Sequence, residues 1–158
     1  MDVQTVKNSL LSSPVLVLDA TEIIANLTVL AKLRGQCGVK ILYSIKALPA
    51  CAVLIIARPF VDGFSVSSLF EARLAHHILG RKAQIHLTTP GIRPDEIAEL
   101  AGIVTHINFN SLTQHQQFSD TVKVRSSIGL RVNPKLSFSA DTRFDPCRQH
   151  SKLGVDID

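Results

Sequence analysis

Short apolar segments alternate with amphipathic segments along most of the chain, and this alternation limits the fold more than any other feature. We predict strands at residues 14–18, 39–45, 60–66, 84–87, 106–109 and 127–132. Apolar residues at helical spacing fall between them, as at Ile23, Ile24, Leu27, Leu30 and Leu33 up to Gly35. Strands and helices alternating in this way form right-handed βαβ units, so the sequence predicts a parallel sheet.

Capping residues mark where the predicted helices begin and end. Asp19 with Glu22, and Ser68 with Glu71, have the spacing of capping boxes, and the second opens a helix that stops at Gly80. Shorter helices are predicted at residues 50–57, at 94–102 (opened by Pro94 and closed by Gly102) and at 111–118. Residues 134–158 are polar and irregular. No linker or repeat divides the chain, so we expect residues 1–158 to form a single unit.

A parallel sheet of this kind is either an open doubly wound sheet or a (β/α)8 barrel. The first strand is not followed by GxGxxG, nor is GxxxxGK[ST] present, which removes support from the nucleotide-binding open sheets. In a barrel the chemistry lies at the carboxyl ends of the strands. Polar residues gather at these ends: Lys46, residues 65–67, Thr88 with Thr89, residues 108–110, and Arg131 with Asn133. We therefore expect an incomplete barrel of five to six strands with a site at this edge.

Composition excludes several other classes of protein. The chain has 158 residues, 46% of them hydrophobic, but no apolar stretch of membrane-spanning length and no secretion signal, so we expect a cytoplasmic protein without a membrane contact. The net charge of +4 comes from scattered basic residues, so no stripe that could follow a phosphate backbone is evident. Only 5% of the residues are aromatic, so no platform for stacking bases is evident either, and both observations argue against nucleic-acid binding. Three widely spaced cysteines and six histidines without an HxxxH pair predict neither disulfides nor a metal site.

Lys46 is the residue that most invites a functional interpretation, because it ends the apolar run ILYSIKALPA. Its stem can simply pack along the apolar wall while the ammonium reaches solvent. Alternatively, a partly desolvated lysine near other cations becomes a nucleophile for a carbonyl group, and pyridoxal phosphate is the commonest such partner. Residue type alone favours the packing role.

Six segments together resemble a known family. SPVLVLD, ILYSIKALPA, DGFSVSSLFEARLA, HINFNSLTQHQQF, IGLRVNPKLSFSA and SKLGV are similar, in order and spacing, to the first part of the alanine-racemase-like pyridoxal-phosphate decarboxylases. This family, of fold type III, includes the ornithine and diaminopimelate decarboxylases, and the segments are most like its carboxynorspermidine branch. The resemblance covers nearly the whole chain and implies a TIM-type barrel.

The resemblance also implies roles for four residues. Lys46 matches the lysine that binds the cofactor covalently, and Arg131 in GLRVNP matches an arginine near the cofactor, although a structural ion pair at the barrel rim is an equal alternative. Glu71 matches an acidic residue near the site, but its place in a capping box already explains it. Ser65 falls where relatives carry an aspartate, which puts a charge-based role there in doubt. Asn110 and Ser111 are interpreted as a turn and a helix cap.

As family membership, the resemblance implies a decarboxylase of carboxynorspermidine or carboxyspermidine in polyamine synthesis, working as a homodimer. In the family, further parts of the barrel and a β-rich domain follow and supply a ring-stacking histidine, a glycine-rich phosphate loop and a catalytic cysteine, none of which is found here. We therefore expect this chain to be the first portion of the barrel domain, and inactive alone. Two alternatives stay open: a non-catalytic pyridoxal-phosphate carrier of the same fold, and an inert remnant that associates with a full-length relative.

Overall fold

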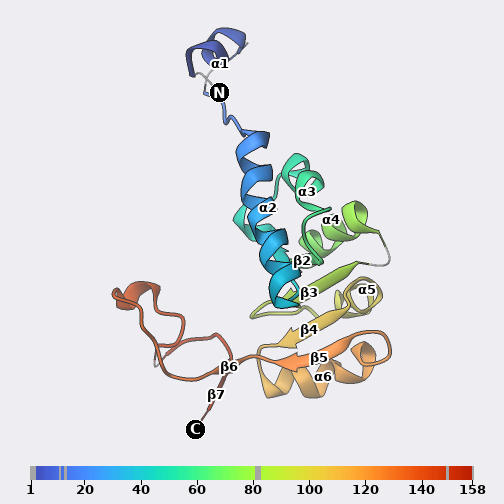
Figure 1. Ribbon diagram of the computed structural model, residues 1–158. Coiled ribbons are helices and arrows are strands. Elements are labelled where there is room, and N and C mark those ends of the chain that lie inside the picture. Colours follow the sequence, from blue (N-terminus) through green and yellow to red (C-terminus); the bar gives the residue numbers. More distant parts are fainter. Residues whose placement is uncertain (1–2, 11, 13, 81–82, 149, 158) are drawn as a thin grey trace.

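A five-stranded parallel sheet forms the centre of the protein, whose computed structural model describes residues 3–10, 12, 14–80, 83–148 and 150–157 (Figure 1). Its strands are β1 (Leu42–Ser44), β2 (Gly63–Val66), β3 (Gln84–Thr88), β4 (His106–Phe109) and β5 (Ser127–Leu130). They are hydrogen-bonded in chain order, β1-β2-β3-β4-β5, and every pair is parallel. An order without reversal is that of a barrel wall rather than of a doubly wound sheet, as predicted. A second, two-stranded parallel sheet joins β6 (Val132–Asn133) to β7 (Val155–Asp156).

Most of the helices cover one face of the sheet (Figure 1), and the last four each follow a strand. They are α1 (Val3–Ser9), α2 (Ala20–Cys37), α3 (Cys51–Ala57), α4 (Leu69–Leu79), α5 (Ile97–Ile103) and α6 (Leu112–Val122), with short 3-10 turns η1 (Ile45–Ala47) and η2 (Thr142–Phe144). Side chains from α3 to α6 form one buried cluster with alternate residues of the strands, such as Phe64, Ile85 and Ile107, each of them fully buried. Helix α1 projects away from this body in Figure 1.

The other face of the sheet is polar and only half-buried. On β3, Ile85 and Leu87 face the helices, while the alternating residues Gln84, His86 and Thr88 face the opposite side. β4 repeats this pattern, because Ile107 and Phe109 are buried and His106 and Asn108 are half-buried. A strand with period two therefore separates the apolar core from a polar face, which is the inner face of the barrel wall.

The predicted caps are found at three helices. The Asp19 carboxylate accepts from the N–H of Thr21 at 2.9 Å, and the Ser68 and Ser111 hydroxyls each accept at 3.2 Å from the N–H three residues ahead. Helix α4 ends before Gly80, as predicted. Helix α2 runs past the predicted end at Gly35 and stops before Gly38, whose φ of 66° is the left-handed conformation that closes helices.

Several predicted element bounds are wrong. The strand predicted at residues 14–18 is not found: this apolar segment has no regular secondary structure and pairs with no described strand, because an apolar run does not specify a hydrogen-bonding neighbour. β1 covers three residues of the predicted 39–45, β2 begins at Gly63, and the last predicted strand divides into β5 and β6 on either side of Arg131. Residues 94–96 form a turn before α5, Gly102 lies inside that helix, and α6 continues to Val122. In the described part of the chain, none of the helices has the length and apolar character needed to cross a membrane.

Candidate active site

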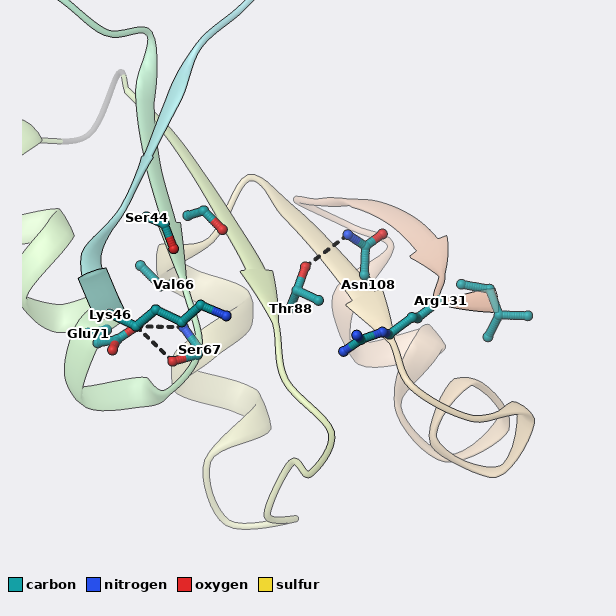
Figure 2. A pocket seen from close by; sticks show the side chains of 10 residues that line it. Ser44, Lys46, Val66, Ser67, Glu71, Thr88, Asn108 and Arg131 are labelled. Atoms are coloured by element: carbon teal, nitrogen blue, oxygen red, sulfur yellow. Dashed lines mark hydrogen bonds between the residues drawn. The ribbon is translucent and has the colours of Figure 1, made fainter. Parts of the chain in front are cut away.

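A pocket of about 450 Å³ opens at the carboxyl ends of the strands, where the barrel fold places its chemistry (Figure 2). Nearly all of its lining is polar or charged. The lining residues are Ser44, Lys46, Ser65, Val66, Ser67, Glu71, Thr88, Asn108, Leu130 and Arg131. The structure thus brings all four residues predicted for the site, Lys46, Ser65, Glu71 and Arg131, into one pocket.

Lys46 emerges from a rigid turn immediately after β1. Ile45, the residue before it, is fully buried in the core, and Leu48 N–H closes the turn by donating to Ile45 O at 3.1 Å. The Tyr43 hydroxyl donates to Leu48 O at 3.4 Å, and burial raises the pKa of Tyr43, so this phenol stays protonated as a donor. The backbone around the lysine is therefore held while the side chain extends into the pocket (Figure 2).

Lys46 is exposed, and the expected desolvation of its amine is not found. Solvent therefore reaches the Lys46 side chain on its open side. Ser44 lies beside Ser65 in the β1–β2 register, and both residues line the pocket next to the lysine. Two neutral hydroxyl groups therefore share the pocket with Lys46.

Glu71 lies in the pocket wall, but its carboxylate is already hydrogen-bonded to a neighbouring residue of the chain. Its Oε2 accepts from Ser67 N–H at 2.7 Å and from the Ser67 hydroxyl at 2.9 Å. A capping box would join this carboxylate to the N–H of the cap residue, Ser68, so here the bond is displaced by one residue. Glu71 thereby fixes the loop that leaves β2 at the edge of the pocket.

Arg131 occupies the opposite wall, between β5 and β6. Its N–H donates to Phe109 O at 2.8 Å and its carbonyl accepts from Val155 N–H at 2.8 Å, so its backbone is held on both sides. None of the described carboxylates pairs with its guanidinium, which removes the alternative of a rim ion pair within the described residues. Figure 2 shows Lys46 and Arg131 pointing into the pocket from its two sides.

The charges in the pocket favour an anionic ligand. Lys46 and Arg131 are two cations, whereas the single carboxylate, Glu71, is engaged by Ser67. The surrounding serine and threonine hydroxyls and the Asn108 amide can supply further hydrogen bonds. Among the described residues, no group of three or more His, Cys, Asp or Glu is placed to hold a metal ion.

Sequence reasoning missed a histidine pair under the pocket. His86 and His106 stack with ring centroids 4.8 Å apart, and His106 Nε2 lies 2.9 Å from Asn108 Oδ1. Burial, then the neighbouring His106 and then Lys40, lowers the pKa of His86. The signal is the period-two spacing of polar residues in QIHLT and HINF, which places both histidines on the polar face of neighbouring strands.

Asn110 also does more than make the predicted turn. Ser111 caps α6 as expected, but the buried Asn110 side chain donates to Lys152 O at 2.8 Å and accepts from Gly154 N–H at 3.0 Å. It thereby ties the SKLGV segment to the end of β4. This long-range contact has no local sequence signal.

Comparison with known proteins identifies similar decarboxylases. The chain is 30% identical over 145 residues to the carboxynorspermidine/carboxyspermidine decarboxylase of Campylobacter jejuni, which covers 92% of this chain and 37% of that protein. It is 32% identical over 148 residues to the carboxyaminopropylagmatine decarboxylase of Synechocystis, covering 93% of this chain and 38% of the relative. The chain therefore spans less than two fifths of the length of these curated relatives. No protein-family model matches it.

Solved structures show the same fold. The crystal structure of Campylobacter jejuni carboxynorspermidine decarboxylase complexed with norspermidine matches with a TM-score of 0.80 at 27% identity, covering 92% of this chain and 36% of that one. Helicobacter pylori diaminopimelate decarboxylase complexed with L-lysine matches with a TM-score of 0.82 at 17% identity, covering 98% and 40%. The prediction of a partial TIM-type barrel is confirmed, and so is the resemblance to carboxynorspermidine decarboxylases over this part of their length.

Proposed function

We propose that this chain forms the cofactor-binding wall of a pyridoxal-phosphate-dependent decarboxylase that acts on carboxynorspermidine or carboxyspermidine. The observation that carries the proposal is the placement of Lys46. It reaches from a fixed turn at the carboxyl end of β1 into a polar, cationic pocket, on a barrel wall similar to that of carboxynorspermidine decarboxylase. The similarity to curated decarboxylases over 92% of the chain supports the reaction class.

The donor set fits pyridoxal phosphate. The pocket of about 450 Å³ lies within the usual range for small-molecule sites, roughly 300–1,000 Å³. A primary amine, which an aldehyde-bearing cofactor requires, lies in the same pocket as an arginine without a carboxylate partner among the described residues. Lys46, Arg131, Ser65 and Glu71 are the residues that would hold the cofactor, which when bound supplies an electron sink for the negative charge left by loss of carbon dioxide.

Each of these residues has a separate task in this proposal. Lys46 supplies the nucleophilic amine, and the exposed side chain is free to swing because only its backbone is held. Arg131 attracts and orients anionic oxygens with a planar array of donors. Glu71 keeps Ser67 in place through two hydrogen bonds, and Ser65 offers a neutral hydroxyl next to the lysine.

The assembly and location of the protein belong to the same proposal. We place it in the cytoplasm, which is consistent with Cys37, Cys51 and Cys147 all being free thiols. A homodimer is supported by large exposed apolar side chains beyond β6, above all Phe138 and Phe144, which are 92% and 77% exposed.

A non-catalytic pyridoxal-phosphate carrier is the second candidate, favoured by one observation: Lys46 is exposed. Release of carbon dioxide from carboxynorspermidine separates the two candidates. A carrier binds the cofactor but gives no release above that of free pyridoxal phosphate, with or without the remaining part of a relative added in trans. A decarboxylase gives release at least in the mixture.

Covalent trapping tests the assignment of Lys46. After incubation with pyridoxal phosphate and reduction with borohydride, mass spectrometry should find the pyridoxyl group on the peptide that contains Lys46. Lys46→Ala should abolish this labelling. Lys40→Ala is the matched control, because Lys40 precedes the same strand at its opposite end and lines no pocket with Lys46. Equal labelling of many lysines, unchanged in Lys46→Ala, would overturn the assignment.

A further inference from the structure

Four side chains on the inner face of β3, β4 and β5 form a continuous chain of hydrogen bonds that ends in the pocket. The Ser127 hydroxyl contacts His106 Nδ1, His106 Nε2 lies 2.9 Å from Asn108 Oδ1, and Asn108 Nδ2 lies 3.0 Å from Thr88 Oγ1. The strand register places Ser127 beside His106 and Asn108 beside Thr88. This series of hydrogen bonds thus runs from the amino ends of the strands to their carboxyl ends, where Asn108 and Thr88 line the pocket.

The Asn108 amide sets the direction of these hydrogen bonds. Its oxygen can only accept, so the neighbouring Nε2 of His106 carries the hydrogen. In the neutral ring Nδ1 is then the acceptor, and the Ser127 hydroxyl donates to it in preference to the more distant Thr105 O at 3.5 Å. The NH₂ group of Asn108 can only donate, so Thr88 Oγ1 accepts. The hydrogen of the Thr88 hydroxyl is therefore left for another acceptor, and no described residue accepts it.

Neighbouring residues leave room for the side chains of this hydrogen-bond series. Gly129 lies beside Asn108 in the β4–β5 register, and a Cβ atom at this glycine would overlap Asn108 Oδ1 and lie 3.3 Å from His106 Nε2. On the other side, His86 stacks on His106 and its own Nε2 lies 3.1 Å from Gln84 Oε1. The lowered pKa of His86 keeps the stacked partner uncharged near neutral pH. Gly129 thus leaves the space that Asn108 and His106 occupy, and His86 packs against the His106 ring.

We propose that Thr88 is a ligand-binding residue whose hydroxyl donates a hydrogen bond to an oxygen of the molecule bound between Lys46 and Arg131, and that His106 and Asn108 are positioning residues that fix this direction. Figure 2 shows Thr88 between the two cations, joined to Asn108. The ligand is one with an anionic oxygen, as the two cations require. The inference deepens the proposed function, on which it rests for the identity of that ligand as pyridoxal phosphate.

The donor-to-acceptor direction of these hydrogen bonds can be tested without any ligand. In the 158-residue chain with ¹⁵N-labelled histidine at about pH 8, the His106 resonances, assigned with His106→Gln, should report a hydrogen on Nε2. A hydrogen on Nδ1 would overturn the proposal. The Asn108 amide would then be reversed, and the Thr88 hydrogen would be consumed by Asn108 Oδ1.

Binding of pyridoxal phosphate, followed by absorbance, tests the role of Thr88. Thr88→Val should weaken binding by about tenfold, the value of one hydrogen bond to a charged group, and Thr88→Ser should retain it. Asn108→Leu should weaken binding in the same direction. The matched control is Thr89→Val, because the Thr89 hydroxyl donates to Gly91 O at 3.1 Å and lines no part of the pocket.

The outcomes distinguish this inference from the proposed function. Binding that Lys46→Ala abolishes but Thr88→Val leaves unchanged overturns the role of Thr88 alone. Binding that Thr88→Val weakens but Lys46→Ala leaves unchanged supports Thr88 and overturns the cofactor role of Lys46. Absence of any binding by the wild-type chain contradicts both.

Discussion

The carboxylate of Glu71 accepts two hydrogen bonds from a single residue, Ser67, one from its N–H and one from its hydroxyl. A similar arrangement recurs two strands further on, where Gln114 Oε1 accepts from Asn110 N–H at 2.9 Å. In both places the accepting side chain lies three residues after the helix cap. The donating N–H belongs to the residue just before that cap. An amide therefore suffices to fix the backbone here, and the charge of Glu71 is not needed for that purpose.

This comparison separates the structural and functional parts of Glu71. Glu71→Gln should keep the backbone bond and lower the free energy of unfolding by no more than about 1 kcal/mol, whereas Glu71→Ala should lower it by about 1–3 kcal/mol. Chemical denaturation of the three proteins measures both changes. If Glu71→Gln keeps its stability but loses affinity for pyridoxal phosphate, the carboxylate acts on the ligand. An equally large loss of stability in both variants would contradict the backbone role of the amide.

Arg131 should matter for binding and little for stability, because no described carboxylate pairs with it. We expect Arg131→Lys to weaken binding of pyridoxal phosphate by about tenfold or more, since a point charge cannot replace a planar group of donors. The midpoint of thermal unfolding should hardly change. Arg125→Lys is the control: Arg125 precedes β5 at its opposite end and lines other cavities. Unchanged affinity in Arg131→Lys would place the arginine outside the binding site.

His86 should make the protein less stable in mild acid. Its folded-state pKa is lowered, by burial first and then by His106 and Lys40, so below about pH 6.5 the unfolded chain binds more protons than the folded chain. The contribution to stability is therefore present above the unfolded pKa and is lost as the pH falls toward the folded one. His86→Gln should lose less free energy of unfolding than the wild type between about pH 7 and pH 5.

The groups that face His86 are Gln84, His106 and, through its charge, Lys40. His77→Gln, at an exposed position on α4, is the matched control and should follow the wild-type pH dependence. Parallel pH curves for wild type and His86→Gln would show that another group causes the loss.

The sequence predicted the barrel wall because polar residues follow the apolar strands and because three of the described helices, α2, α4 and α6, begin at a recognisable cap. Ser68 and Ser111 act within three residues of themselves, so local spacing is enough to find them. The pocket followed from the same rule, since the carboxyl ends of parallel strands meet at one edge. Lys46 and Arg131 were therefore placed together although 85 residues separate them.

Contacts that depend on strand register could not be predicted from the sequence pattern. The link from His106 to Thr88 through Asn108 needs β3 and β4 to be aligned residue by residue, and apolar alternation is the same for any shift of two. Residues 14–18 show the opposite failure, an apolar run that was predicted as a strand but pairs with no described strand. The exposure of Lys46 also could not be predicted, because it depends on what surrounds the pocket and not on the strand that carries the lysine.

Asn110 should hold the SKLGV segment against the end of β4. Its amide bonds both Lys152 O and Gly154 N–H while only 8% exposed, so an alanine leaves two backbone groups without these partners. We expect Asn110→Ala to lower the free energy of unfolding by about 2–4 kcal/mol, from two hydrogen bonds at about 1–2 kcal/mol each. Asn110→Asp should keep the bond from Gly154 N–H and lose the one to Lys152 O, with an intermediate cost.

Hydrogen exchange locates this effect in the structure. In Asn110→Ala the amides of Gly154 and Val155 should exchange faster, because Val155 N–H is held on Arg131 O only while the segment stays docked. Amides of β2 and β3, which are distant from the segment, should exchange at rates that follow the global loss of stability alone. Ser137→Ala, in the same irregular region, is the control, since its hydroxyl accepts only from Ser139 N–H at 3.1 Å. Uniformly faster exchange in Asn110→Ala, without a larger change at Gly154 and Val155, would contradict a specific tether.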